Sequence, residues 1–416
     1  MKSIINYANG LVLLGFFAFL PSAYSMSTLD GLKKMVNNHL TYLGKQQALE
    51  LSQAQVLVKK ASFLPTLALT ANSNRDHEFN QSSFVTSGVV SLNVWRSGAD
   101  LPALSAAKFN LQSTSQQLTS SKFTAERQSM SFLISAVLQE QKLKILQSTL
   151  ENRQELFNIA EQRYKQGLIP LQQHIQAEVD LENAKAQLRD GQMAQKSRLA
   201  EIASLLGNSD IALDWPWQDY FKSSSAKNLL LKKLDKDTRP DFQALAINVQ
   251  AQQELLTQSK RLFFPTVDLS VARNRTASGS YTQYDTSAQI TLSIPLFEKL
   301  SDYGSYKEQV YNTALANYEL NQMDRGIAAD FVAKKYSYEQ GLIRVQGWDK
   351  LVQKEEKNFR AFLLGFKQGR LNYQQLAQEQ DRLNQTKLLA ISGMEGLHLA
   401  YADYCHALGL SIFSCN

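Results

Sequence analysis

The chain has 416 residues, of which 44% are hydrophobic and 20% charged, and its formal net charge at pH 7 is +6. It contains only 19 glycines and 8 prolines. This composition excludes an extended disordered chain and a collagen. No stretch reaches the roughly 20 apolar residues that a membrane-spanning helix needs, which excludes a helical membrane protein.

The N-terminus has the pattern of a secretory signal peptide. A short polar segment that starts at Lys2 precedes an apolar run at 11–20, and Ala23-Tyr24-Ser25 supplies the small residues of a cleavage site. The apolar run is about half as long as a spanning helix. We therefore predict that residues 1–25 direct export and are then removed.

The rest of the chain contains two copies of one unit. The segment FLPTLALT at 63–70 reappears about 200 residues later as FFPTVDLS, SLNV at 91–94 reappears as TLSI, and YKQG at 164–167 reappears as FKQG. One such match arises by chance, but several in the same order do not. We predict a first repeat at 26–206, a connecting segment at 207–238 and a second repeat at 239–416.

Each repeat contains a very long amphipathic helix, predicted at about 100–166 and about 302–366. Apolar residues follow a strict 3–4 alternation along both segments, which is the pattern of a left-handed coiled coil. Charged residues, among them Arg153 and Glu355, interrupt this seam. The interruptions suggest a wet or variable partner surface.

Shorter helices complete each repeat. Gly167 and Gly369 end the long helices, and return helices are predicted at about 171–206 and 371–409. A further helix is predicted before each pair of strands, at about 28–61 and 240–262.

Two β-hairpins are predicted at about 64–96 and 264–297, where apolar and polar residues alternate. Such strands have one apolar and one polar face. A half-buried sheet on a soluble core has the same pattern; in a membrane, the apolar side chains face lipid and the polar ones a watery lumen. The residues that would face lipid are Leu67, Leu69, Val90, Leu92, Val94, Val267, Leu269, Ile290, Leu292 and Ile294.

The membrane interpretation also requires oligomerisation. Four strands leave two open edges, which a bilayer does not tolerate. Three chains that pair edge to edge close a barrel of twelve strands.

Together these features resemble the TolC-like outer membrane efflux proteins over nearly the whole chain. The two Pro-Thr segments, IPLF at 294–297, RPD at 239–241 and the YKQG and FKQG hairpins carry the resemblance. It implies a mainly α chain with a small β part, built as an internally duplicated helical-hairpin tube with two β-hairpins. A homotrimer would form a twelve-stranded β-barrel in outer membrane lipid and a twelve-helix α-barrel in the periplasm, closed where the helix hairpins meet.

The resemblance also implies where the functional contacts lie. Gly167, Leu168, Gly369 and Arg370, at the hairpin tips, would dock a periplasmic adaptor protein. That adaptor connects the tube to an inner-membrane transporter or a secretion ATPase. The periplasmic aperture is expected at Tyr164, Gln173, Phe366, Gln375 and Gln378.

The aperture departs from the family's pattern in its charge. Where some members have rings of aspartate, this chain has Gln375 and Gln378, and Phe366 lacks the hydroxyl that a tyrosine there would use. Neutral amides bind cations far less well than carboxylate rings do. We therefore expect that other contacts hold the closed state and that divalent cations block the channel only weakly.

The two cysteines, Cys405 and Cys415, lie at the extreme C-terminus. An exported protein meets an oxidising compartment, so a disulfide that closes this short loop is a reasonable prediction. The alternative is a metal site formed with His398 and His406, but their spacing matches no standard zinc motif.

The sequence carries no catalytic motif of the GxSxG, P-loop, HExxH or CxxC type. A modest positive charge on an exported chain does not favour nucleic-acid binding. We therefore predict no enzyme, no cofactor and no nucleic acid, but an outer membrane exit duct for the efflux of small molecules or for type I protein secretion. The alternative is a periplasmic coiled-coil structural or interaction protein without a pore, which leaves the four alternating strands unexplained.

Overall fold

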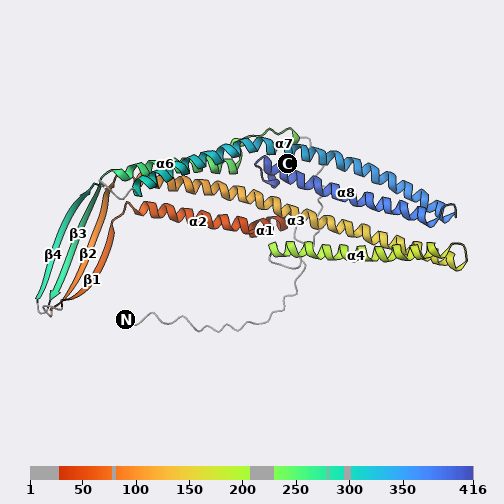
Figure 1. Ribbon diagram of the computed structural model, residues 1–416, viewed down its shortest axis with the longest axis horizontal. Coiled ribbons are helices and arrows are strands. Elements are labelled where there is room, and N and C mark those ends of the chain that lie inside the picture. The colour runs from red at the N-terminus through yellow and green to blue at the C-terminus, as the bar shows by residue number, and fades with distance from the viewer. Residues whose placement is uncertain (1–27, 77–80, 207–228, 279–280, 295–300, 416) are drawn as a thin grey trace.

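A computed structural model describes residues 28–76, 81–206, 229–278, 281–294 and 301–415. The molecule is elongated, with a four-stranded sheet at one end and two helical hairpins at the other (Figure 1). The predicted mainly α architecture with a small β part is confirmed. The predicted signal peptide, most of the connecting segment and the IPLF motif after its first residue lie outside the described residues.

The helices form two sets with the same order. The first set comprises α1 (Thr28–Asn38), α2 (Leu40–Ala61), α3 (Asp100–Lys165) and α4 (Leu171–Leu206). The second set comprises α6 (Pro240–Lys260), α7 (Ser301–Lys367) and α8 (Tyr373–Ala407). With 66 and 67 residues, α3 and α7 are each about 100 Å long.

The shorter helices lie along these two long ones. Figure 1 shows α2 beside the sheet-side half of α3 and α4 beside the other half, while α6 and α8 share the length of α7 in the same way. Where one helix was predicted over 28–61, the structure has two. His39 adopts an extended backbone between them, although no glycine or proline marks this break.

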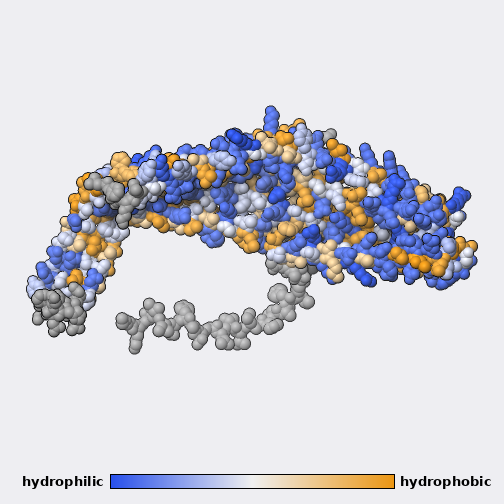
Figure 2. Space-filling view, viewed as in Figure 1, coloured by the Kyte–Doolittle hydropathy of each residue, from blue (hydrophilic) through white to orange (hydrophobic). Residues whose placement is uncertain are grey.

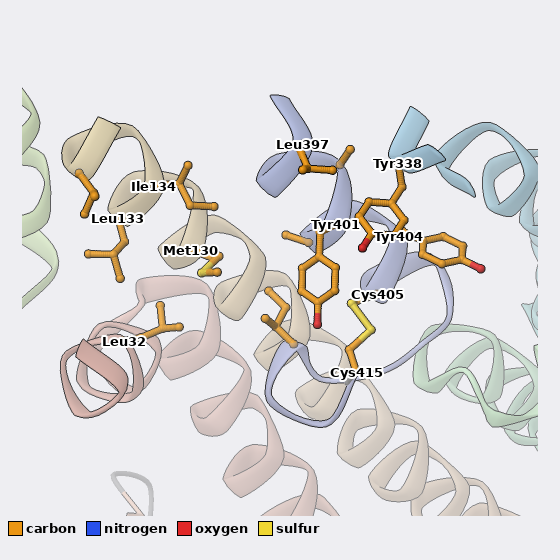
Figure 3. Packing of buried hydrophobic residues seen from close by; sticks show 14 of the residues in the cluster. Leu32, Met130, Leu133, Ile134, Tyr338, Leu397, Tyr401, Tyr404, Cys405 and Cys415 are labelled. Carbon is orange, nitrogen blue, oxygen red and sulfur yellow. A yellow bond between two sulfur atoms is a disulfide. The ribbon is translucent and has the colours of Figure 1, made fainter. Parts of the chain in front are cut away.

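The main hydrophobic core lies midway along the molecule, where the helices of both sets meet (Figure 3). Met130 and Ile134 of α3 pack there with Tyr338 of α7 and with Tyr401 and Tyr404 of α8. The rings of Tyr338 and Tyr404 stack with centroids 5.8 Å apart. This core joins the two repeats into one body.

The sheet consists of β1 (Thr66–Asp76), β2 (Gln81–Arg96), β3 (Thr266–Ser278) and β4 (Tyr281–Ser293). All neighbours are antiparallel in the order β1-β2-β3-β4. The hairpin of each repeat therefore pairs with the other through β2 and β3, and β1 and β4 are left as open edges.

The strand register places apolar residues on one face. Val90 lies opposite both Leu67 and Val271, and Leu269 lies opposite both Leu92 and Ile290. A bulge between Asn93 and Trp95 interrupts the β2–β3 pairing. Most of this face is exposed in the single chain, with Leu67 and Leu69 at 74% and 77%. Among the described helices, none is long and apolar enough to cross a membrane.

Candidate functional site at the tips of the helical hairpins

The two helical hairpins turn at glycines with a left-handed backbone. Gly167 has φ +70° and Gly369 has φ +73°, a region that other residues enter only with strain. The N–H of Leu168 donates to the carbonyl of Arg163, and the N–H of Arg370 donates to that of Gly365, each over 2.9 Å. These bonds satisfy the last carbonyls of α3 and α7 and fix the two turns.

A small apolar cluster holds the two tips together. It is formed by Leu156, Ala160, Ala177, Phe366, Tyr373, Leu376 and Ala377, which come from both hairpins. Phe366 is only 2% exposed. The guanidinium of Arg163 lies 4.5 Å from the centre of its ring and donates to its backbone carbonyl over 3.1 Å. Phe366 was expected at the aperture, but in this structure its side chain is part of the tip core.

An ion-pair network around a buried arginine lies beside this cluster. Arg153 of α3, whose side chain is 4% exposed, pairs with Asp180 of α4 over 3.3 Å and with Asp381 of α8. It also donates to the carbonyl of Ala377 over 3.4 Å. The Tyr373 hydroxyl donates to Asp180 over 2.9 Å. These four side chains, the Arg153 cluster (Arg153, Asp180, Tyr373 and Asp381), connect the two hairpins of one protomer.

The energetics of the Arg153 cluster follow from its burial. A buried guanidinium is costly unless its donors are satisfied, and here two carboxylates and a carbonyl accept from it. Burial and the Asp180 carboxylate raise the pKa of Tyr373, so its phenol stays protonated and donates. The loss of either carboxylate leaves a donor of the buried guanidinium without a partner, and the loss of Arg153 leaves Asp180, which is 17% exposed, without its counter-charge.

Six of the nine predicted tip and aperture residues line one groove between the hairpins, with a volume of about 380 Å³. They are Leu168, Gln173, Phe366, Gly369, Arg370 and Gln375. The groove therefore brings together residues that are some 200 positions apart in the sequence.

The other three predicted residues, Tyr164, Gly167 and Gln378, do not line this groove. Tyr164 stacks on His174, with ring centroids 5.0 Å apart, so His174 is packed within its own hairpin. Gln378 is exposed on α8. Gln375, although it lines the groove, also accepts from the N–H of Asn372 in a capping box that starts α8.

The Arg153 cluster is a structural feature of the tips that the sequence did not predict. Arg153 and Glu355 were expected to mark a wet or variable partner surface, but the structure buries both within the protomer. Glu355 pairs with Arg382 over 3.0 Å. The signal was present, because a charge within a long apolar seam requires either water or a partner charge, but the partner could not be identified from spacing.

At the other end of α8, Cys405 and Cys415 form a disulfide beside the tyrosines of the central core (Figure 3). Ser411 and the N–H of Ile412 within this loop donate to the buried carboxylate of Glu126, over 2.7 and 3.1 Å. His398 and His406 do not join the cysteines in a metal site, and no other cluster of metal ligands is found among the described residues.

Comparison with solved structures identifies close likenesses in fold. The outer membrane protein VceC from Vibrio cholerae is 15% identical, with a TM-score of 0.77 over 92% of this chain and 96% of VceC. CusC is 14% identical, with a TM-score of 0.78 over 98% and 99%. The outer membrane channel MtrE from Neisseria gonorrhoeae, in its open state, is 15% identical, with a TM-score of 0.76 over 92% and 88%.

The sequence itself matches one family. No curated protein sequence is similar enough to count as a match. The profile of the outer membrane efflux protein family, however, matches residues 35–208 and 234–343, which is more than half of the chain. The duplicated hairpins, the antiparallel sheet and this match agree, and the chain belongs to the outer membrane efflux protein family.

Proposed function

We propose that three copies of this chain form an exit duct, with a β-barrel in the outer membrane and a helical tube in the periplasm. The observation that carries the proposal is the sheet, which combines an exposed apolar face with two open edges, β1 and β4. Neither feature is stable in a lone chain in lipid or in water. Pairing β4 of one protomer with β1 of the next removes the edges and turns the apolar face to lipid.

The opposite face of the sheet suits a watery lumen. Asn93 donates to Asp268 over 2.6 Å, and Ser87 donates to Asn274 over the same distance. Both pairs bridge β2 and β3 on the polar face. A barrel with polar side chains inside and apolar ones outside has the alternation of a membrane channel.

The helical part also has two surfaces that a neighbouring chain would cover. On α7, exposed apolar residues recur on the side opposite the buried one: Leu315, Tyr318, Val332, Tyr336 and Ile343. On α4 they are Leu171, Ile175, Val179 and Met193, and on α2 they include Leu40, Leu51, Leu57 and Val58. Figure 1 places α7 along one long edge and α2 and α4 along the other. Two different edges that pair head to tail generate a closed ring when the rotation between neighbours closes on itself.

At the far end of the tube, the hairpin tips would close the duct and dock its partners. The Arg153 cluster holds the two hairpins of each protomer together and is the contact that replaces the missing aspartates. The groove with Leu168 and Arg370 would receive a periplasmic adaptor, which links the duct to an inner-membrane transporter or secretion ATPase. The cargo is then small molecules or secreted protein.

The test combines cell fractionation with a deletion strain. Heat-modifiable trimers in the outer membrane fraction are expected, together with drug sensitivity or missing secreted proteins in the deletion strain, restored by the wild-type gene. A monomeric pool in the soluble periplasm would contradict the duct and favour a coiled-coil scaffold without a pore.

A further inference from the structure

Two arginines of β3 lie on the apolar face of the sheet. At alternate positions β3 carries Val267, Leu269, Val271, Arg273 and Arg275, and residues two apart in a strand point to the same face. Both arginine side chains are exposed. Within the described part of the chain, neither guanidinium takes part in an ion pair or a hydrogen bond.

The acidic residues of β3 and β4 lie on the other face. Asp268 lies between Leu269 and Val267 in sequence, and Asp285 of β4 is paired with Asn274, which points away from the two arginines. The sheet therefore separates the guanidinium groups from these carboxylates. Among the described residues of β3 and β4, no carboxylate shares a face with Arg273 and Arg275, so an anionic group in the surroundings of the apolar face can pair with them.

Aromatic side chains indicate where the two arginines lie along the membrane normal. Phe63 and Phe264 are exposed at the helix-side end of the sheet, just before β1 and β3. Tyr284 lies directly opposite Arg275, toward the far end of the strands. From Phe264 to Arg273, an extended strand rises about 30 Å, or about 21 Å along the membrane normal at a tilt of about 45°. Aromatic girdles flank an apolar band about 25 Å tall, so the arginines lie at its far boundary.

The surface agrees with this placement. Figure 2 shows apolar residues gathered on the helix-side part of the sheet and more hydrophilic ones toward its far end. An arginine facing lipid costs about 2–4 kcal/mol at the bilayer midplane but about 0–1 near an interface. At the boundary a guanidinium meets lipid headgroups, and it binds phosphate through paired charge-assisted hydrogen bonds.

We propose that Arg273 and Arg275 form a binding site for the phosphate groups of a phosphorylated glycolipid, lipopolysaccharide, in the outer leaflet. The inference rests on the proposed function, which directs the helices into the periplasm and thus the far ends of the strands outward. Two guanidinium groups two residues apart match a ligand with more than one phosphate, which favours this glycolipid over a phospholipid with a single phosphate.

The test uses the full-length protein in nanodiscs of phosphatidylethanolamine that contain either lipopolysaccharide or phosphatidylglycerol. Native mass spectrometry counts the anionic lipids that each trimer retains. The variants are Arg273→Gln/Arg275→Gln, the charge-preserving Arg273→Lys/Arg275→Lys, and the control Lys33→Gln/Lys34→Gln. The control removes two exposed positive charges from α1, far from the sheet.

We expect the glutamine variant to retain lipopolysaccharide at least about 5-fold less than wild type, while the lysine variant and the control retain most of it. Phosphatidylglycerol should be retained weakly by all of them. Equal retention by the glutamine variant, an equal loss in the control, or phosphatidylglycerol retained as well as lipopolysaccharide would overturn the site. If the trimers insert normally but lipid retention contradicts the site, the proposed function stays intact. A wild-type protein that does not insert would overturn both the lipid site and the proposed function.

Discussion

At the residue scale, we expect the proposed closure of the tips to depend on Arg153, which joins the two hairpins of a protomer. Removing one partner of a buried ion pair costs about 3–5 kcal/mol when the remaining charge stays desolvated. Without Arg153 this applies to Asp180, which is 17% exposed, but not to Asp381, which is 67% exposed. We expect Arg153→Met to destabilise the tips and to shorten the closed periods in single-channel recordings.

A matched control for Arg153 lies on α4. Arg198 pairs with Glu201 over 3.1 Å, but both side chains are substantially exposed. Such a surface pair contributes about 0.2–1 kcal/mol. Arg198→Met should therefore leave stability and gating nearly unchanged. If Arg153→Met behaves in the same way in denaturation and conductance, the cluster does not hold the closed state.

His398 gives the central core a dependence on pH. Burial lowers the pKa of His398 to about 4, whereas an unfolded histidine titrates near 6.5. Between these values the unfolded chain binds a proton that the folded chain does not. Stability is therefore complete above about pH 6.5 and falls by up to about 3 kcal/mol as the pH drops to 4.

This dependence can be measured with guanidinium denaturation at several pH values. His398→Leu should flatten the acid side of the profile by about the amount that His398 contributes. Leu397→Ala, a neighbouring core change, should cost about 2–5 kcal/mol at every pH and leave the slope unchanged. An unaltered slope in His398→Leu would show that other groups cause the loss.

Residue-scale features were the hardest to predict from the sequence. The seam showed that Arg153 and Glu355 were unusual, but their burial depends on how closely a second hairpin approaches. The burial of Phe366 likewise depends on the other repeat, because Arg163 lies over its ring. Contacts between residues about 200 positions apart are a property of tertiary packing and leave no local pattern.

At the scale of elements, the C-terminal loop stabilises the end of α8. The disulfide between Cys405 and Cys415 closes a loop with a sequence separation of 10, and the chain-entropy model gives about 2–3 kcal/mol for a loop of this length. We expect Cys405→Ser/Cys415→Ser to lose about this much stability. A reductant should destabilise wild type equally and leave the double variant unchanged; an equal effect on both would assign the loss to something else.

The hairpin tip is the element expected to contact the adaptor. Arg370 is exposed at the rim of the groove, so Arg370→Glu should weaken adaptor binding several-fold in co-purification. Arg360→Glu, an exposed position further back on α7, is the control and should bind normally. Unchanged co-purification of the Arg370 variant would remove this residue from the docking surface.

Elements were predicted well where a pattern is long and local. A 3–4 spacing of apolar residues over more than sixty residues defines where α3 and α7 lie in the sequence. The alternation of apolar and polar residues does the same for the strands. The break at His39 and the bulge after Asn93 were not predicted. Neither glycine nor proline marks the break, and the bulge is defined by the opposing strand. Both depend on tertiary neighbours that cannot be identified from the sequence.

At the scale of the whole molecule, assembly rests on the exposed stripe of α7. This stripe lies opposite the face that Ala316, Ile327 and Tyr338 bury within the protomer. In the proposed trimer a neighbouring chain covers it. Placing a carboxylate in such an interface costs several kcal/mol per charge, because it is desolvated without a partner.

We therefore expect Tyr318→Glu/Tyr336→Glu to weaken trimer formation by about 100-fold or more, since each 1.4 kcal/mol corresponds to a factor of ten. Light scattering of the purified protein in detergent measures this directly. Asn317→Glu/Ser337→Glu adds the same two charges at exposed positions beside the stripe and should remain trimeric. Trimers that persist in the tyrosine variant would show that the ring closes through the sheet alone, because the edges of β1 and β4 are then sufficient to hold three chains together.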